Sequence, residues 1–116
     1  MIIEETAVDG VTVFRLRGDF ISEPDQMTLQ QKVRDLVRNG KTRLVVDLRD
    51  VHYINSCGIG SLVGALTTLR RAGGEIYLAE STKEVRAVFE TTQLQQIFQF
   101  HPRASDAVRA VDHPTV

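Results

Sequence analysis

The chain has 116 residues, the size of one ordinary domain, and can bury a hydrophobic core without a disulfide or a structural metal. Hydrophobic residues make up 42% and charged residues 25%, a globular composition that excludes a coiled coil, a collagen-like repeat or a wholly disordered chain. The formal net charge of −1 leaves no positive excess for binding nucleic acid or anionic lipid.

The first third of the chain is predicted to form a hairpin and a helix. Residues 2–6 and 11–17 are strand-like, and Asp-Gly at positions 9–10 is typical of a hairpin turn. Ser22 is a helix cap, and Pro24 falls in the first turn that follows it. One apolar face of the predicted helix, which ends at Asn39 and Gly40, comprises Leu29, Val33, Leu36 and Val37.

A buried strand and a second helix are predicted in the middle of the chain. Residues 43–48 are largely apolar without alternation, which is typical of a strand covered on both faces. After a short segment, either Asn55 or Ser56 can cap a helix. Its apolar stripe runs through residues 59–69, and Gly73 with Gly74 ends it.

The last third of the chain continues the alternation of predicted strands and helices. Residues 75–80 are predicted to form a strand, and Ser81 with Glu84 is predicted to form a capping box for a short helix. A strand over 97–100 and a helix over 104–111 complete the chain.

The resulting order of elements is β-β-α-β-α-β-α-β-α. Strands that alternate with helices imply right-handed crossovers, so we predict an α/β domain with a mixed, mostly parallel sheet. The sheet should begin with the N-terminal hairpin and be accompanied by about four helices. A single domain is expected over residues 1–111, with a frayed C-terminal tail over 112–116.

The most informative stretch is Asn-Ser-Cys-Gly-Ile-Gly at positions 55–60, where a loop leaving a buried strand enters a helix. The N–H groups at a helix start lack partners within the helix, and the helix dipole adds about half a positive charge there. An anion at Ser56 is therefore favoured, either as a bound phosphate or as a phosphate carried by the serine. The alternative is that Ser56 only caps the helix, while Gly58 and Gly60 let it pack near the sheet.

Enzymatic and metal sites have weaker support. Cys57 or Ser56 could act as a nucleophile, but the sequence places no base beside either. The three histidines lack metal-ligand spacing and a single cysteine cannot build a disulfide or a zinc site of cysteines, so neither metal nor cofactor is expected. The chain begins without the basic and apolar regions of a signal peptide and has no apolar run of membrane-spanning length, which predicts a soluble, cytoplasmic protein.

Residues 47–60, with the sequence D-L-R-D-V-H-Y-I-N-S-C-G-I-G, resemble the STAS domain of bacterial anti-sigma-factor antagonists. The pattern of that family is approximately D-L-x-x-V-x-F-I-D-S-S-G-L-G. The resemblance extends to Gly18 and Asp19 after the second strand, to residues 71–75 before the fourth, and to residues 82–100. It covers nearly the whole chain, and the order of elements is that of the family.

The resemblance implies a non-enzymatic partner-switching protein that regulates transcription. In such systems the unphosphorylated antagonist binds an anti-sigma factor with serine-kinase activity and frees a sigma subunit. Phosphorylation of the serine that matches Ser56 breaks the complex, and a serine phosphatase restores it. The partner-binding surface is expected at Asp19, Ile21, Ser22, Asn55, Ser56, Cys57, Gly58 and Ile59.

Three positions depart from the family pattern. Asn55 replaces an acidic residue, Cys57 replaces a serine or threonine, and Ile21 stands where the family often has an acid. These departures motivate a second hypothesis, a STAS scaffold or sensor-complex component that binds partners without being phosphorylated. A small enzyme using Cys57 or Ser56 is the third.

Overall fold

The N-terminal hairpin forms around the predicted turn. In the computed structural model, which describes residues 1–112, strand β1 (Ile2–Val8) pairs antiparallel with β2 (Val11–Arg17). The turn residues Asp9 and Gly10 have φ angles of 52° and 78°, the left-handed conformation that a tight two-residue hairpin turn requires. Pairing continues to the turn itself, so β1 extends to Val8 rather than ending at the predicted residue 6.

The remaining elements alternate as predicted. In chain order they are α1 (Glu23–Arg38), β3 (Arg43–Asp50), α2 (Ser56–Arg71), β4 (Glu75–Ala79), α3 (Lys83–Thr91), β5 (Gln99–His101) and α4 (Ala104–Asp112). The predicted cap of α1 is confirmed, because the Asp25 N–H donates to Ser22 Oγ at 3.3 Å. Residues 113–116, which include most of the predicted frayed tail, lie outside the described residues.

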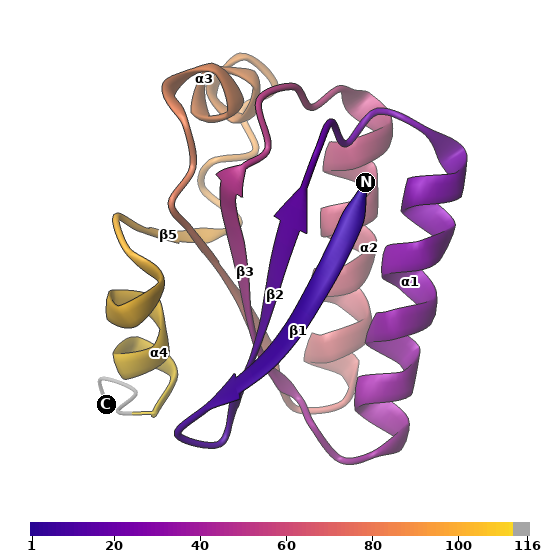
Figure 1. Ribbon diagram of the computed structural model, residues 1–116, viewed down its shortest axis with the longest axis vertical. Helices are drawn as coiled ribbons and strands as arrows, with labels where there is room; N and C mark the ends of the chain where they lie inside the picture. Colours follow the sequence, from indigo (N-terminus) through magenta and orange to yellow (C-terminus); the bar gives the residue numbers. More distant parts are fainter. Residues whose placement is uncertain (113–116) are drawn as a thin grey trace.

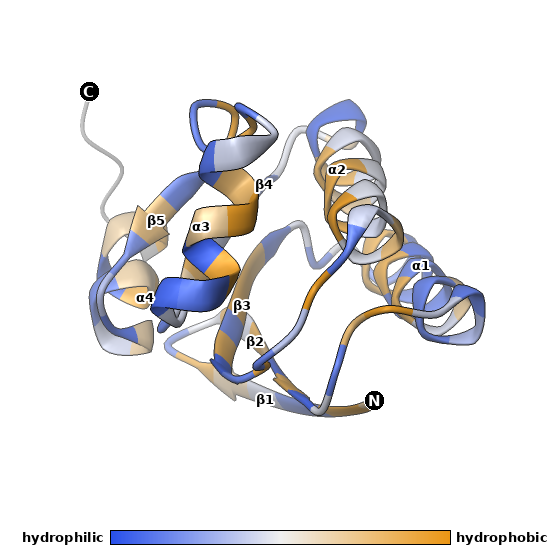
Figure 2. Ribbon diagram, turned by 90° about the horizontal axis from the view of Figure 1, so that it is seen from above, coloured by the Kyte–Doolittle hydropathy of each residue, from blue (hydrophilic) through white to orange (hydrophobic). Residues whose placement is uncertain are grey.

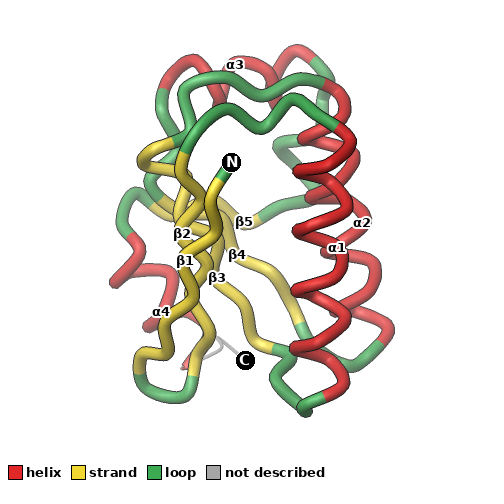
Figure 3. Tube along the Cα trace, turned by 45° about the vertical axis from the view of Figure 1, so that its right-hand side comes forward, coloured by secondary structure: helices red, strands yellow, loops and turns green. Residues whose placement is uncertain are grey.

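The five strands form one sheet in the order β1-β2-β3-β4-β5, in which only the β1–β2 pair is antiparallel. Helices α1 and α2 cover one face and α4 covers part of the other (Figures 1 and 3). Helix α3 lies near the end of the sheet toward which the parallel strands point (Figure 1). This arrangement confirms the predicted α/β fold with a mixed, mostly parallel sheet.

Two hydrophobic clusters fill the space between these layers. The larger lies between the sheet and α1, α2 and α3, and includes Phe14, Val46 and Leu62. The smaller lies between the sheet and α4, and includes Val45 and Val108. Neighbouring residues of β3 thus enter different clusters, which explains why this strand lacks polar alternation. Figure 2 shows the apolar residues of α1 and α2 gathered toward the sheet.

The predicted cap of α3 is wrong. Thr82, not Ser81, precedes the helix in an extended conformation, and its Oγ1 accepts from the Val85 N–H at 3.2 Å. A capping hydroxyl must belong to the residue directly before the first helical one, and the helix begins one residue later than the Ser81–Glu84 box requires.

The predicted start of the last strand is also wrong. The Ile97 N–H donates to the Leu94 carbonyl at 3.3 Å and closes a turn, so residue 97 is not extended. Strand β5 begins at Gln99, which pairs with Tyr77 of β4, and ends at His101.

Candidate functional site

The start of α2 is built by Asn55 rather than by Ser56. Asn55 has an extended backbone, and its Oδ1 accepts from the N–H groups of Cys57 at 3.0 Å and Gly58 at 3.2 Å. The hypothesis that Ser56 caps this helix is therefore wrong. Ser56 is the first helical residue and is exposed, and within residues 1–112 its hydroxyl makes no hydrogen bond.

Two loops meet beside this helix start. The Phe20 N–H donates to the Tyr53 carbonyl at 2.9 Å, and Phe20 forms a parallel β-bridge with Ile54. The Asn55 side chain adds a third link, because its Nδ2 donates to the Ile21 carbonyl at 3.1 Å. The structure thus brings the predicted residues of positions 19–22 next to those of positions 55–59.

Gly58 is required by this close approach. A Cβ atom at Gly58 would collide with the Phe20 carbonyl oxygen and with Cγ1 of Ile54. A Cβ atom at Gly60 would meet nothing within 4 Å, so the prediction of close packing is wrong for that glycine. The two glycines of the motif therefore have different roles.

The predicted surface residues differ in accessibility. Asp19, Ile21, Asn55 and Ser56 are exposed, and Ser22 and Cys57 are partly buried. Gly58 is buried and Ile59 is only 3% exposed, because both face the sheet side of the helix. The expectation that these last two contact a partner directly is corrected, since they support the surface from beneath.

Three further residues at this surface were missed from the sequence. Tyr53 is 68% exposed and lines a hollow of about 360 Å³ together with Asp19, His52 and Glu84. Tyr53 lies in the recognised motif, so its position could have been noticed. Glu84 belongs to α3, and only the tertiary structure places it beside these loops. Two carboxylates and an aromatic ring make this hollow suited to a cationic group.

The arrangement provides no activated nucleophile within residues 1–112. Cys57 is a partly buried free thiol, and none of the described hydrogen bonds joins its sulfur or the Ser56 hydroxyl to a histidine or a carboxylate. Nucleophilic catalysis normally needs such a base. The same residues contain no group of three or more His, Cys, Asp or Glu side chains that could hold a metal, and no helix long and apolar enough to cross a membrane.

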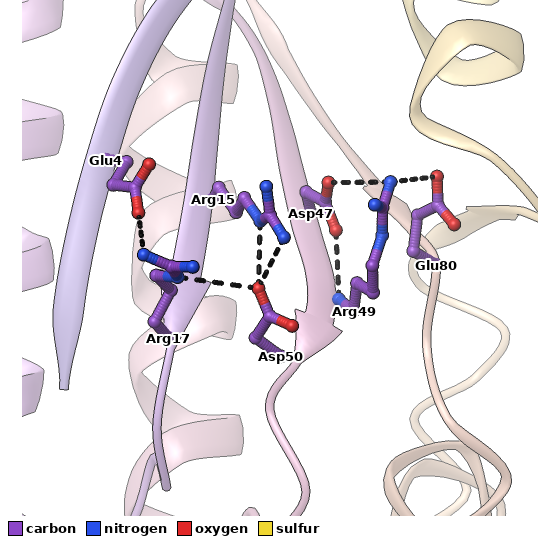
Figure 4. Close-up of polar contacts among 7 residues, drawn as sticks. All are labelled: Glu4, Arg15, Arg17, Asp47, Arg49, Asp50 and Glu80. Atoms are coloured by element: carbon purple, nitrogen blue, oxygen red, sulfur yellow. Dashed lines mark hydrogen bonds and ion pairs between the residues drawn. The ribbon is translucent and has the colours of Figure 1, made fainter.

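A different polar region lies on the face of the sheet that carries α4 (Figure 4). Arg15 donates from Nε to Asp50 at 2.9 Å and forms an ion pair with the same carboxylate through Nη2 at 2.8 Å. Nη1 of Arg17 lies 2.7 Å from Oε1 of Glu4, and Nε of Arg17 lies 3.6 Å from Oδ2 of Asp50. Each charged group of this outer network therefore has an opposite charge beside it.

The outer network continues from β3 toward α4. Nη2 of Arg49 lies 3.9 Å from Oδ2 of Asp47 and 3.2 Å from Oε2 of Glu80 (Figure 4). The same oxygen of Glu80 also accepts from the Ala104 N–H at 3.0 Å. Asp47 is only 4% exposed and accepts from the Arg49 N–H at 2.9 Å. These contacts tie the ends of β3 and β4 to the first turn of α4.

The ion pairs of the outer network shift the pKa of Asp50. Desolvation, the largest single influence, acts to raise the pKa of its carboxyl, whereas the hydrogen bond and the charge of Arg15 lower it. With the charges of Arg17 and Arg49, they hold the pKa of Asp50 below its ordinary value. The same hydrogen bond raises the pKa of Arg15.

The five-stranded mixed sheet with helices on both faces, and with an exposed serine at the first position of α2, defines a small α/β domain. The chain belongs to the STAS domain family, whose model matches residues 3–107. This confirms the family resemblance of residues 47–60.

Individual relatives agree with this membership. The Bordetella bronchiseptica protein BtrV is 31% identical over 91 residues, which cover 78% of each chain. The anti-sigma-B factor antagonist of Staphylococcus aureus is 27% identical over 97 residues, covering 82% of this chain and 87% of its own. Among solved structures, the Bacillus cell fate determinant SpoIIAA in its phosphorylated form has the same fold, with a TM-score of 0.72, 19% identity and coverage of 95% and 99% of the two chains.

Proposed function

We propose that this chain is a cytoplasmic, non-enzymatic anti-sigma-factor antagonist whose binding is controlled by phosphorylation of Ser56. In the unphosphorylated state it binds an anti-sigma factor with serine-kinase activity and so regulates transcription. A serine phosphatase reverses the modification. The observation that carries the proposal is the exposed Ser56 hydroxyl at the first position of α2, beside loop residues that are themselves exposed.

A phosphate at this position is compatible with the fold. It brings about −1.5 to −2 charges, and the positive end of the α2 dipole stabilises negative charge in the first helical turn. Asn55 already satisfies the N–H groups of Cys57 and Gly58, so the helix start does not depend on the serine hydroxyl. Phosphorylation can therefore change the surface without unfolding the domain.

The same phosphate is incompatible with a partner seated on this surface. A docked protein would have to desolvate the charge and accommodate its volume. A loss of about 3 kcal/mol weakens a complex more than about a hundredfold. The support from relatives is consistent with this, because the S. aureus protein is an anti-sigma-B factor antagonist and SpoIIAA exists in a phosphorylated form.

The hollow lined by Asp19, Tyr53 and Glu84 suggests the partner's chemistry. Asp19 and Glu84 supply two carboxylates, and the Tyr53 ring supplies an apolar face. A lysine or arginine side chain of the anti-sigma factor would find both an ion pair and a cation–π contact there. We therefore place the docking surface across Asp19, Ile21, Tyr53 and Ser56, with Glu84 at its edge.

The test compares variants of Ser56 against a candidate anti-sigma-factor kinase of the same organism. We expect Ser56→Ala to keep the affinity of the wild type and Ser56→Asp to lose at least about tenfold, measured by isothermal titration calorimetry. Mass spectrometry after incubation of the wild type with that kinase and ATP should show one phosphate, on Ser56. Equal affinities of the two variants, together with an unmodified Ser56, would contradict the proposal.

A second candidate function is a STAS scaffold that binds without phosphorylation. Asn55 favours it, because this chain has an amide where the family has an acid, and that amide is engaged in holding the two loops together. Size-exclusion chromatography with light scattering distinguishes the scaffold from the phosphorylation-controlled switch. A stable large assembly of the protein alone supports the scaffold, whereas a small species with a phosphorylatable Ser56 supports the switch.

A further inference from the structure

A second pocket lies between α3 and β5, and none of its residues belongs to the surface around Ser56. Its volume is about 490 Å³, within the range of small-molecule sites. It is lined by residues of the α3 start and outer face and of the β5 end, which are Ser81, Thr82, Lys83, Arg86, Ala87, Glu90, Phe100, His101 and Pro102.

Basic groups converge on this pocket from two elements. Lys83 and Arg86 lie three residues apart on one face of α3, and His101 comes from the end of β5. Glu90 is the one carboxylate among the lining residues. Its side chain is 60% exposed, and its Oε1 lies 3.9 Å from Nε of Arg86, at the limit of an ion pair. The lining therefore has an excess of positive charge.

Arg86 is held in place for binding an anion. Its guanidinium carbon lies 3.8 Å from the centre of the Phe100 ring, a stacking contact that fixes the plane of the group. The side chain remains 40% exposed and lines the pocket. A planar guanidinium fixed in this way presents two parallel N–H donors to a phosphate at little entropic cost.

One guanidinium nitrogen and one imidazole nitrogen at this site make no hydrogen bond within residues 1–112. Within the described part of the chain, Arg86 Nε and His101 Nε2 are buried and make no hydrogen bond. Buried polar atoms in native proteins are nearly always hydrogen-bonded, so two buried nitrogens without a hydrogen bond in one pocket require an explanation. An anion that draws Arg86 and His101 toward it would supply the missing acceptor.

The start of α3 adds two hydroxyl groups, which can donate hydrogen bonds, to the same pocket. Ser81 and Thr82 precede the nine-residue helix, and Thr82 uses its oxygen to cap Val85. The helix dipole favours negative charge at this end. Donors thus surround the pocket from the helix start, from the α3 face and from β5, which suits the several oxygens of a phosphate better than the two of a carboxylate.

We propose that this pocket binds the phosphate group of a small phosphomonoester. The volume exceeds that of the phosphate alone and leaves room for an organic portion. The site is separate from the docking surface around Ser56, so it can exist whether or not the partner-switching proposal is correct.

The test is an NMR titration of ¹⁵N-labelled protein with phenyl phosphate, compared with benzoate and with benzyl alcohol. We expect saturable shifts confined to the amides of residues 81–87 and 99–101, weaker binding of benzoate and none of benzyl alcohol. Arg86→Gln should weaken phenyl phosphate binding by at least about tenfold, because a hydrogen-bonded charge pair is lost. Lys83→Gln, at an exposed position, should weaken it by a smaller factor.

Arg109→Gln is the matched control, because Arg109 is an exposed arginine of α4 outside the pocket. Its affinity for phenyl phosphate should equal that of the wild type. Shifts that do not saturate, benzoate binding as tight as that of phenyl phosphate, or an equal loss in Arg109→Gln would overturn the proposal. If Arg86→Gln fails to fold, an unchanged affinity in Lys83→Gln would overturn it instead.

Discussion

The start of α2 and the outer network both carry polar side chains, but they use them in opposite ways. On the outer face of the sheet, Arg15 and Arg17 form ion pairs with the carboxylates of Glu4 and Asp50 within the chain. At and beside the start of α2, the side chains of Ser56 and Asp19 are exposed and, within residues 1–112, make no hydrogen bond or ion pair. Groups satisfied internally contribute to the fold, whereas unsatisfied exposed groups remain available to a partner.

The contacts that hold each region in place also differ. The α2 start depends on contacts between backbones that leave no room for side chains, as at Gly58. The outer network depends on long, partly exposed side chains, which solvent and salt screen. Substitutions should therefore be severe beneath the α2 start and mild on the outer face.

The largest effect is expected for Gly58→Ala. The new methyl group would collide with the Phe20 carbonyl, and the backbone must shift to relieve the contact. We expect the free energy of unfolding to fall by about 1–3 kcal/mol, measured by urea denaturation. Gly60→Ala is the control, since its methyl group would enter open space and should raise stability by about 0.5–1 kcal/mol. Equal effects of the two changes would contradict the assigned packing.

The next largest loss of unfolding free energy is expected for substitutions of Asn55. Asn55→Ala removes both cap hydrogen bonds and the link to the Ile21 carbonyl, and should cost about 1–2 kcal/mol in unfolding free energy. Asn55→Asp keeps an accepting oxygen for the cap but loses the donor to Ile21, so its loss should be smaller. Hydrogen exchange at residues 19–22 should rise in both variants. An unchanged exchange rate in Asn55→Asp would show that the amide does not hold the loops together.

The smallest effect is expected for Asp50→Asn in the outer network. Because the folded-state pKa of Asp50 lies below its ordinary value, its ion pairs stabilise the fold above the unfolded pKa of about 3.9. That contribution is lost as the pH falls through the lower, folded-state pKa. The thermal midpoint of Asp50→Asn should therefore lie below that of the wild type at neutral pH, and the two should converge in strong acid. A difference independent of pH would exclude the ionic origin.

Much of the fold could be predicted from local signals. The Asp9–Gly10 turn, the Ser22 cap and the continuous apolar run of β3 each depend on residues adjacent in the chain, and the structure confirms all three. The ends of elements were less predictable where two neighbouring residues could serve equally. Thr82 rather than Ser81 caps α3, and Asn55 rather than Ser56 caps α2, because the packing of each helix decides which residue is extended.

The sequence by itself determined the order of elements, the family pattern around Ser56 and therefore the place where function should be sought. Only the tertiary structure decided that the Asn55 amide joins two loops, and that Glu84 lines one hollow together with Asp19 and Tyr53. It also decided that Arg86 stacks on Phe100 in a pocket that His101 lines as well. The physical reason is the separation along the chain of the groups that interact. Turns and caps are set by hydrogen bonds within a few residues, whereas these groups are distant in the chain and meet only when helices pack on the sheet.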